Sequence, residues 1–300
     1  MKILIAGSSG LVGSTLRASL LRDGHTVLPL VRPPIVASEG QVGWNPETGE
    51  FGAEAAAGAN AVINVAGASV AEGRWTERRK QVLRTSRVEA TRGLVDAMAK
   101  LVPRPQVFVC ASAVGYYGDR GDEKLGENST TGSGFLAELV SDWEAEASRA
   151  ETFGIRTVML RLGIVLTARG GALAQMIGPF RLGIGGRLGS GRQWMSWLSM
   201  ADTTGMFRAA IEDERYRGAY NAVAPEPVTN AEFTRMLGRM LHRPTLFPVP
   251  AVALRAIFGQ MAGEMLLASQ RVEPSRAVQN GYSYSYQDLE PALRAALDES

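Results

Sequence analysis

A glycine-rich segment near the amino terminus constrains the fold of this chain more than any other feature. It reads Gly7-Ser8-Ser9-Gly10-Leu11-Val12-Gly13, directly after a short apolar run and directly before an amphipathic segment with helical periodicity. Gly7 allows a tight turn out of a strand, Gly10 lets the main chain approach a pyrophosphate, and Gly13 lets the helix and the strand pack closely.

A pyrophosphate on this segment would lie at the helix amino terminus, where free N–H groups and the helix dipole favour negative charge. An ordinary glycine-rich turn is the alternative, but the order of strand, turn and helix favours a dinucleotide site. Its expected contacts are Gly7, Ser9, Gly10, Leu11, Val12 and Gly13.

The rest of the chain alternates short apolar runs with amphipathic segments up to about residue 167, a pattern typical of βαβ units. Strands are expected at 3–6, 26–31, 61–65, 107–111 and 156–162, and helices at 11–21, 76–100 and 134–153. Residues 168–199 are rich in glycine and arginine and are expected to form a loop with functional contacts. Further helices are expected near 201–212, 229–241, 250–258 and 287–298.

This organisation predicts an α/β fold with a Rossmann-type, doubly wound parallel sheet. Residues 1–167 would form the NADP-binding Rossmann domain. Residues 168–300 would form a smaller, mostly helical substrate-binding lobe with a carboxyl-terminal extension, and the two parts would interleave around one site.

Composition argues against several other classes of function. The 32 basic and 30 acidic residues leave a net charge of only +2, so there is no strong electrostatic case for nucleic acid or for an anionic membrane. A single cysteine, Cys110, and two distant histidines predict neither a disulfide nor a metal site. No apolar stretch approaches the roughly 18 residues of a membrane span, so the chain is expected to be cytoplasmic; an organelle lumen reached through a removed presequence is the alternative.

The residue after the second expected strand indicates which nicotinamide cofactor is bound. Leu30-Val31-Arg32 offers no carboxylate for a ribose 2′-hydroxyl, whereas Arg32 can pair with a 2′-phosphate. A solvated arginine at a strand end is the alternative. We therefore expect NADP(H), with Val31 and Arg32 at its adenosine end.

The spacing of the glycines resembles that of the short-chain dehydrogenase/reductase (SDR) superfamily, specifically its extended, epimerase-like branch. Asn64-Val65-Ala66-Gly67 is similar to the superfamily's N-x-A-G segment, and Ser86-Arg87-Val88-Glu89-Ala90-Thr91 is similar to the S-R-x-x-x-T stretch of an atypical subgroup. Members of that subgroup carry a carboxyl-terminal extension and are named epimerase family proteins or nucleoside-diphosphate-sugar epimerases. Further similar stretches lie at 74–76, 114–118, 161–166, 170–172, 221–225 and 229–233.

The resemblance implies further cofactor contacts beyond the glycine segment. It places Val65, Ala66, Gly67 and Gly163 beside the cofactor. It also makes Arg87 a second cation near the cofactor, although a helix-surface arginine is an equal alternative.

Active members of the superfamily use a tyrosine whose pKa is lowered by a lysine four residues later, with a nearby serine or threonine. The helix expected at 134–153 contains neither tyrosine nor lysine, and its apolar residues follow the spacing of a packing face. Ser112 and Tyr116, which follow the strand expected at 107–111, are the remaining catalytic candidates. Loop packing and cofactor positioning are the alternative roles for both.

Two functions remain open. The first is an NADP(H)-dependent oxidoreductase or epimerase with altered proton-transfer groups, acting on a small-molecule substrate held by Arg187, Arg192, Trp194 and Trp197. These four residues could equally support the loop that carries them. The second is a non-catalytic NADP(H)-binding or sensing module. Related folds often dimerise through helices equivalent to those near 80–100 and 135–150, so a homodimer is also open.

Overall fold

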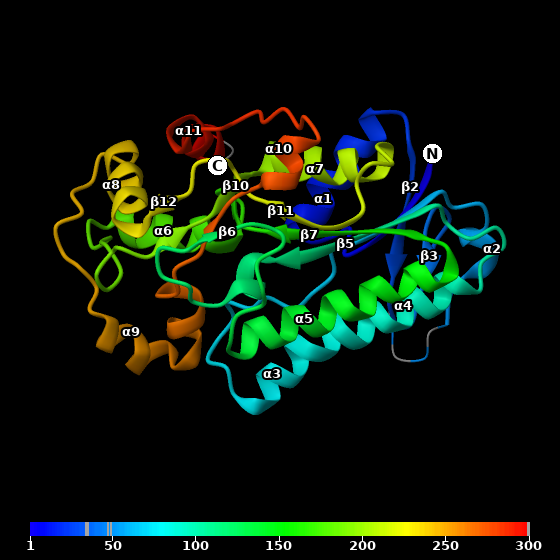
Figure 1. Ribbon diagram of the computed structural model, residues 1–300, viewed down its shortest axis with the longest axis horizontal. Coiled ribbons are helices and arrows are strands. Elements are labelled where there is room, and N and C mark those ends of the chain that lie inside the picture. Colours follow the sequence, from blue (N-terminus) through cyan, green and yellow to red (C-terminus); the bar gives the residue numbers. More distant parts are fainter. Residues whose placement is uncertain (34–35, 47, 49, 299–300) are drawn as a thin grey trace.

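A seven-stranded sheet forms the centre of the computed structural model, which describes residues 1–33, 36–46, 48 and 50–298 (Figure 1). The strands run in the order β11-β7-β5-β4-β1-β2-β3, and every neighbouring pair is parallel. Their bounds are β1 Lys2–Ala6, β2 Thr26–Val31, β3 Val42–Gly43, β4 Ala61–Asn64, β5 Val107–Ala113, β7 Arg156–Leu162 and β11 Gly218–Ala222. The central strands are buried on both faces, which explains their nearly continuous apolar sequences.

The direction of winding changes beside β1. Strands β2 and β3 follow on one side of β1, whereas β4, β5 and β7 lie on the other. Connections leaving a sheet in opposite directions open a crevice at the carboxyl ends of the strands where the order reverses. The fold therefore places its crevice beside the glycine segment that follows β1.

Helices cover both faces of the sheet, as the doubly wound prediction requires (Figure 1). α1 (Leu11–Arg22) packs with α7 (Met200–Glu212) on one face. On the other face lie α3 (Glu77–Arg84), α4 (Ala90–Ala99) and α5 (Phe135–Ser148). The short α2 (Ala53–Ala56) precedes β4. The helix expected at 76–100 consists of α3 and α4 joined through a π-turn at Thr85–Glu89.

A smaller, mostly helical lobe follows, and it has its own hydrophobic core. Its helices are α6 Gly171–Arg181, α8 Asn230–Met240, α9 Ala251–Phe258 and α11 Leu289–Asp298. In contrast, α10 (Ser275–Gln279) contacts β11 and buries Ala277 in the core of the main sheet. Three small ladders lie outside the main sheet: β8 (Ile164–Leu166) with β10 (Trp197–Ser199), β9 (Trp194–Met195) with β12 (Val228–Thr229), and β6 (Lys124–Leu125) with β13 (Arg271–Val272).

The expectation of a loop throughout 168–199 is wrong for α6. Leu173, Ile177 and Phe180 are buried along this helix and follow the spacing i, i+4, i+7. The sequence also gave no signal for β11, which pairs with β7 at the edge of the main sheet. The sheet therefore takes its last strand from beyond residue 167, and the proposed domain boundary there stays a prediction.

Candidate functional site

The turn between β1 and α1 can form only because glycines occupy two of its positions. Gly7 has a φ of +82°, and a Cβ atom on it would lie 2.7 Å from the Ala66 nitrogen. A Cβ atom on Gly13 would lie 2.0 Å from the Gly7 carbonyl oxygen. Only glycine fits these two positions, because any other residue would push the first turn of α1 away from β1. Gly10 caps α1 without a side chain, which leaves the first N–H groups of the helix for a ligand.

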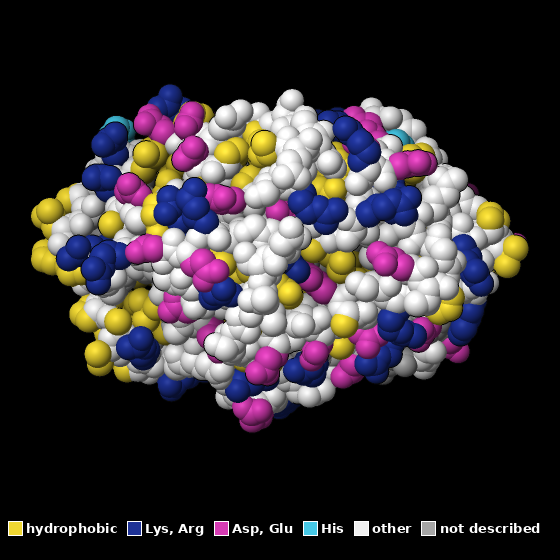
Figure 2. Space-filling model, viewed as in Figure 1, with side chains coloured by type: hydrophobic (Ala, Val, Ile, Leu, Met, Phe, Trp, Pro, Cys, Tyr) yellow, Lys and Arg dark blue, Asp and Glu magenta, His cyan; other side chains and the backbone are white. Residues whose placement is uncertain are grey.

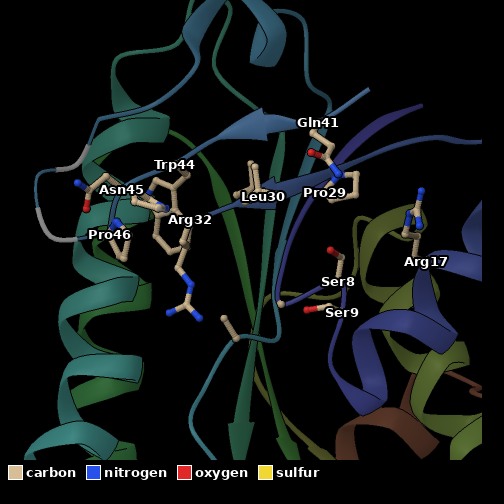
Figure 3. Close-up of a pocket in the computed structure, with 14 residues that line it drawn as sticks. Ser8, Ser9, Arg17, Pro29, Leu30, Arg32, Gln41, Trp44, Asn45 and Pro46 are labelled. Carbon is tan, nitrogen blue, oxygen red and sulfur yellow. The ribbon is translucent and has the colours of Figure 1, made fainter. Parts of the chain in front are cut away.

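A cavity of about 590 Å³ lies beside this turn, at the carboxyl ends of β1 and β2 (Figure 3). Figure 3 shows the Arg32 side chain extending from the end of β2, with Ser8 and Ser9 across the cavity from it. Arg17 and Arg32 line the cavity, and no Asp or Glu is among the described residues that line it. Arg32 is exposed and forms no ion pair with the residues that the structure describes. The cavity thus presents uncompensated positive charge to an anionic group.

The segment after β4 is held in place by the buried side chain of Asn64. Its Oδ1 atom accepts a hydrogen bond from the Ala66 N–H at 3.1 Å, and its Nδ2 atom donates to Thr91 Oγ1 at 2.9 Å. These bonds fix Val65 and Ala66 at the carboxyl end of β4, beside the glycine turn. The N-x-A-G segment therefore has a clear structural reason for its asparagine.

Arg87 lies against Gly67, and its role as a second cation near the cofactor stays a prediction. The Arg87 guanidinium carbon would be 3.0 Å from a Cβ atom on Gly67. Burial, together with repulsion by Arg79, lowers the pKa of Arg87 to about 10. Arg87 is still positively charged at neutral pH, because that value lies well above 7. It contributes a partly buried cation to the same edge of the sheet.

Gly163 lies at the end of β7, in close contact with the strand that follows Ser196. A Cβ atom on Gly163 would lie 2.6 Å from the Ser196 carbonyl oxygen. This packing alone requires glycine here. A contact between Gly163 and a cofactor stays a prediction.

Ser112 belongs to a buried ion-pair network at the carboxyl ends of β5 and β7. Its Oγ atom donates to Glu144 Oε1 at 2.5 Å. Glu144 also accepts two hydrogen bonds from Arg161, both of 2.8 Å, in the bidentate geometry of a strong ion pair. Burial by itself would lower the pKa of Arg161, but the pair with Glu144 outweighs it and raises that pKa. The Ser112 hydroxyl therefore donates its hydrogen bond to a buried ion pair and has no proton free for a substrate.

Two tyrosines extend this network toward the surface. Tyr117 is fully buried; its hydroxyl accepts from Arg161 Nη1 at 2.9 Å and donates to Asn221 Oδ1 at 2.7 Å. Burial raises the pKa of Tyr117. The half-buried Tyr116 stacks on Arg161, with 3.6 Å between the guanidinium carbon and the ring centroid. No hydrogen bond joins the Tyr116 hydroxyl to another residue in the described part of the chain.

The network contains residues that sequence reasoning missed. Glu144 lies on the otherwise apolar, buried face of α5, and Arg161 follows the apolar run Val158-Met159-Leu160 of β7. A buried charge on an apolar face was the available signal, because such residues are almost always paired. Their pairing could not be read from the sequence, since they lie on different elements.

The structure does not gather the four substrate candidates around one cavity. Arg187 and Arg192 are exposed. Trp194 donates from its indole nitrogen to Asp122 at 2.8 Å, and the guanidinium carbon of Arg271 lies 4.3 Å from the ring centroid. Trp197 is completely buried in the core of the smaller lobe, so it has no exposed face for a ligand.

The carboxyl-terminal segment braces the loop that follows β5. Glu264 accepts hydrogen bonds from the Phe135 N–H at 3.2 Å and the Leu136 N–H at 2.8 Å, so its carboxylate caps α5. Ser269 donates from its main chain to Asp119 at 3.0 Å and from its hydroxyl to the Gly121 carbonyl at 2.6 Å. This segment therefore holds both ends of the loop between β5 and α5.

Metal and thiol chemistry have no visible site among the residues that the structure describes. No group of three or more His, Cys, Asp or Glu side chains there could hold a metal ion. Cys110 is buried on β5, and burial raises its pKa to about 12, so the thiol is not a nucleophile at neutral pH. None of the helices in the described ranges is long and apolar enough to cross a membrane.

Known proteins resemble this chain over its whole length. Residues 3–222 match the model of the NAD dependent epimerase/dehydratase family, and residues 249–296 match a domain of unknown function. The chain is 44% identical over 291 residues to epimerase family protein MT2273 of Mycobacterium tuberculosis, covering 97% of this chain and 96% of that protein. It is 35% identical over 297 residues to human epimerase family protein SDR39U1, covering 98% and 99% of the two chains.

Solved structures agree with these sequence matches. The crystal structure of human epimerase family protein SDR39U1 (isoform 2) with NADPH matches with a TM-score of 0.89 and 33% identity, covering 100% of both chains. That of a nucleoside-diphosphate sugar epimerase from Corynebacterium glutamicum matches with a TM-score of 0.81 and 34% identity, covering 99% of this chain and 58% of that one. The chain therefore belongs to the NAD dependent epimerase/dehydratase family, as an extended SDR protein with the carboxyl-terminal domain of unknown function, in agreement with its sequence motifs.

Proposed function

We propose that this chain binds NADP(H), with the adenosine end of the cofactor in the cavity beside β1 and β2. The observation that carries the proposal is the charge of that cavity, which Arg17 and Arg32 line without any carboxylate. A 2′-phosphate would neutralise this charge, whereas the ribose 2′-hydroxyl of NAD(H) would leave it uncompensated. The NADPH in the structure of human SDR39U1 supports the same assignment.

Several parts of the chain would share the binding. The glycine turn and the amino terminus of α1 would hold the pyrophosphate, because Gly7 and Gly13 let the turn pack closely against its neighbours and no side chain caps α1. Val65, Ala66, Gly67 and Arg87 would line the crevice further along the edge of the sheet. When bound, NADP(H) supplies a hydride donor or acceptor for a carbonyl or alcohol carbon.

For the reaction, we propose oxidoreductase or epimerase chemistry without the usual Tyr-x-x-x-Lys pair, on a small-molecule substrate. Leu136 and Val140 on α5 have the i, i+4 spacing of such a pair and both face Gly115 of the turn after β5, where a Cβ atom would lie 3.4 Å from Leu136 and 4.0 Å from Val140. Neither side chain can carry a proton. Tyr116 is the better remaining candidate, because its hydroxyl has no partner in the described part of the chain, whereas Ser112 donates to Glu144.

A non-catalytic NADP(H)-binding module is the second candidate. Two observations favour it: Leu136 and Val140 cannot transfer a proton, and the Ser112 hydroxyl donates to the buried ion pair. A homodimer stays a prediction under either function.

The cofactor proposal is tested by replacing Arg32 with glutamate. Isothermal titration of wild type and Arg32→Glu with NADPH and NADH should show a preference for NADPH in wild type that falls by about tenfold to a hundredfold in the variant. The matched control is Arg22→Glu, an exposed arginine at the end of α1 that does not line the cavity. An unchanged ratio of NADPH to NADH affinity in Arg32→Glu would reject the assignment.

The reaction is tested separately by cofactor turnover over a panel of carbonyls, quinones and sugar nucleotides. If the chain is an enzyme, Tyr116→Phe should lower kcat by about a hundredfold or more while Ser112→Ala retains most of it. Tight NADPH binding by wild type with no turnover on any substrate would instead favour the non-catalytic module.

A further inference from the structure

One end of the smaller lobe exposes an unusual set of apolar side chains. Six large apolar residues there are between 58% and 77% exposed: Leu182, Ile184, Leu246, Phe247, Val252 and Ile257. Isolated exposed apolar residues are normal on a protein surface, but a contiguous group calls for an explanation. Figure 2 shows yellow side chains gathered at the left end of the molecule, over α9 and the segment before it, with dark blue cations among them.

The two segments that carry these residues lie against each other. The Val249 N–H donates to the Arg187 carbonyl, and the Gly189 N–H donates to the Val249 carbonyl, both at 2.8 Å. Arg243 donates from Nε to the Arg181 carbonyl at 2.8 Å. The six apolar side chains, with Arg181, Arg243 and Arg255 among them, therefore form one surface, which we term the basic apolar face.

The charged side chains of this region are all positive. Residues 181–192 and 233–257 contain seven arginines and no aspartate or glutamate. Arg181, Arg243 and Arg255 are exposed, and none of them forms an ion pair with the residues that the structure describes. The net charge of +2 for the whole chain conceals this local excess. The face therefore fits a partner that is both apolar and negatively charged.

A second copy of the chain is a poor partner, because a two-fold contact would bring this face against itself and oppose like charges. A folded protein is also disfavoured. The apolar side chains are Leu, Ile, Val and Phe, and Leu and Val are rare among the hot spots of protein interfaces. Leu and Phe interspersed with arginine are instead the composition of surfaces that lie in the headgroup region of a bilayer.

We propose that the basic apolar face binds the surface of membranes that contain anionic phospholipid. The arginines would lie among the headgroups, and Leu246, Phe247 and Val252 would enter the boundary with the acyl chains. Such binding is peripheral, and it leaves the cavity at β1 and β2 unaltered, since none of the residues of the face lines that cavity.

The test is sedimentation of the full chain with lipid vesicles. Wild type should bind vesicles of phosphatidylcholine containing about one third phosphatidylserine, bind phosphatidylcholine alone far more weakly, and be released as salt is raised. Leu246→Ser combined with Phe247→Ser should weaken binding to the anionic vesicles by about tenfold or more. Arg255→Glu should weaken it by about tenfold.

Two matched variants control for general effects of polarity and charge. Val278→Ser removes an exposed valine on α10, and Arg22→Glu reverses an exposed arginine on α1; both should bind vesicles like wild type. Melting temperatures would verify that every variant is folded. Failure of wild type to bind the anionic vesicles, or equal binding by the face variants and the controls, would overturn the proposal and favour an acidic protein as the occupant.

Discussion

Two neighbouring regions at the carboxyl edge of the same sheet differ in how their polar groups are used. At β1 and β2, glycines leave a cavity, the first N–H groups of α1 have no side-chain cap, and Arg32 forms no ion pair with a described residue. At β5 and β7, the side chains of Ser112, Glu144 and Arg161 bond to one another and are almost fully buried.

The difference indicates which region can bind a ligand and which region mainly stabilises the fold. Unpaired charge and bare main chain beside a cavity remain available to a ligand, whereas a network in which every group is paired mainly fixes the fold. In this second region, the two positions on α5 that have the spacing of the superfamily's Tyr-x-x-x-Lys pair are Leu136 and Val140, which face the turn after β5, and Ser112 donates to the buried ion pair. Ligand recognition therefore belongs to the first region, and the buried ion pair of the second region serves stability.

The largest effect should come from breaking the buried ion pair. Glu144→Ala leaves Arg161 charged and unpaired at 4% exposure, so we expect unfolding free energy to fall by about 3–5 kcal/mol. Chemical denaturation monitored by circular dichroism measures this. The matched control, Glu290→Ala, removes the partner of Arg294 in an exposed pair and should change stability by less than about 0.5 kcal/mol. Similar losses in the two variants would show that the network is not structural.

A methyl group in the glycine turn should have the next largest effect. Gly13→Ala places a Cβ atom where the Gly7 carbonyl oxygen lies 2.0 Å away, so α1 must shift. We expect a loss of about 1–3 kcal/mol in stability and the loss of measurable NADPH binding by titration. Gly178→Ala is the control, because a Cβ atom there meets nothing within 4 Å and alanine favours the helix. NADPH affinity like that of wild type in Gly13→Ala would contradict the role of the turn.

Removing the Ser112 hydroxyl should have the smallest effect. Glu144 keeps both hydrogen bonds from Arg161 in Ser112→Ala, so stability should fall by only about 1–2 kcal/mol. NADPH affinity should stay within about twofold of wild type, because the hydroxyl belongs to the other region. A tenfold loss of affinity in calorimetric titration would mean that the two regions are coupled.

The features that could be predicted from the sequence are local ones. The glycine turn, the order of the first strands and helices, and Arg32 at the end of β2 depend on residues close together in the chain. Their physical requirements, such as bare main chain at Gly7, appear directly in the residue types.

The features that were missed depend on packing between distant segments. Glu144 and Arg161 pair only because α5 crosses the end of β7. In α6, the glycines around its start and Pro179 within it obscured the apolar spacing of Leu173, Ile177 and Phe180. For Trp197, contact with a ligand and support of the loop were equally open from the sequence, and its strand places it in the core of the smaller lobe. Tertiary context overrode the local pattern in each case.

We infer above all that the cavity at β1 and β2 selects a dinucleotide with a 2′-phosphate. Isothermal titration of the wild-type chain tests this inference directly. The protein is first freed of any cofactor that co-purifies and then titrated with NADPH and, separately, with NADH. The account predicts one site per chain and a preference for NADPH of about tenfold or more. Equal affinity for the two cofactors would contradict the role of Arg32, and binding of neither would contradict the assignment of the crevice.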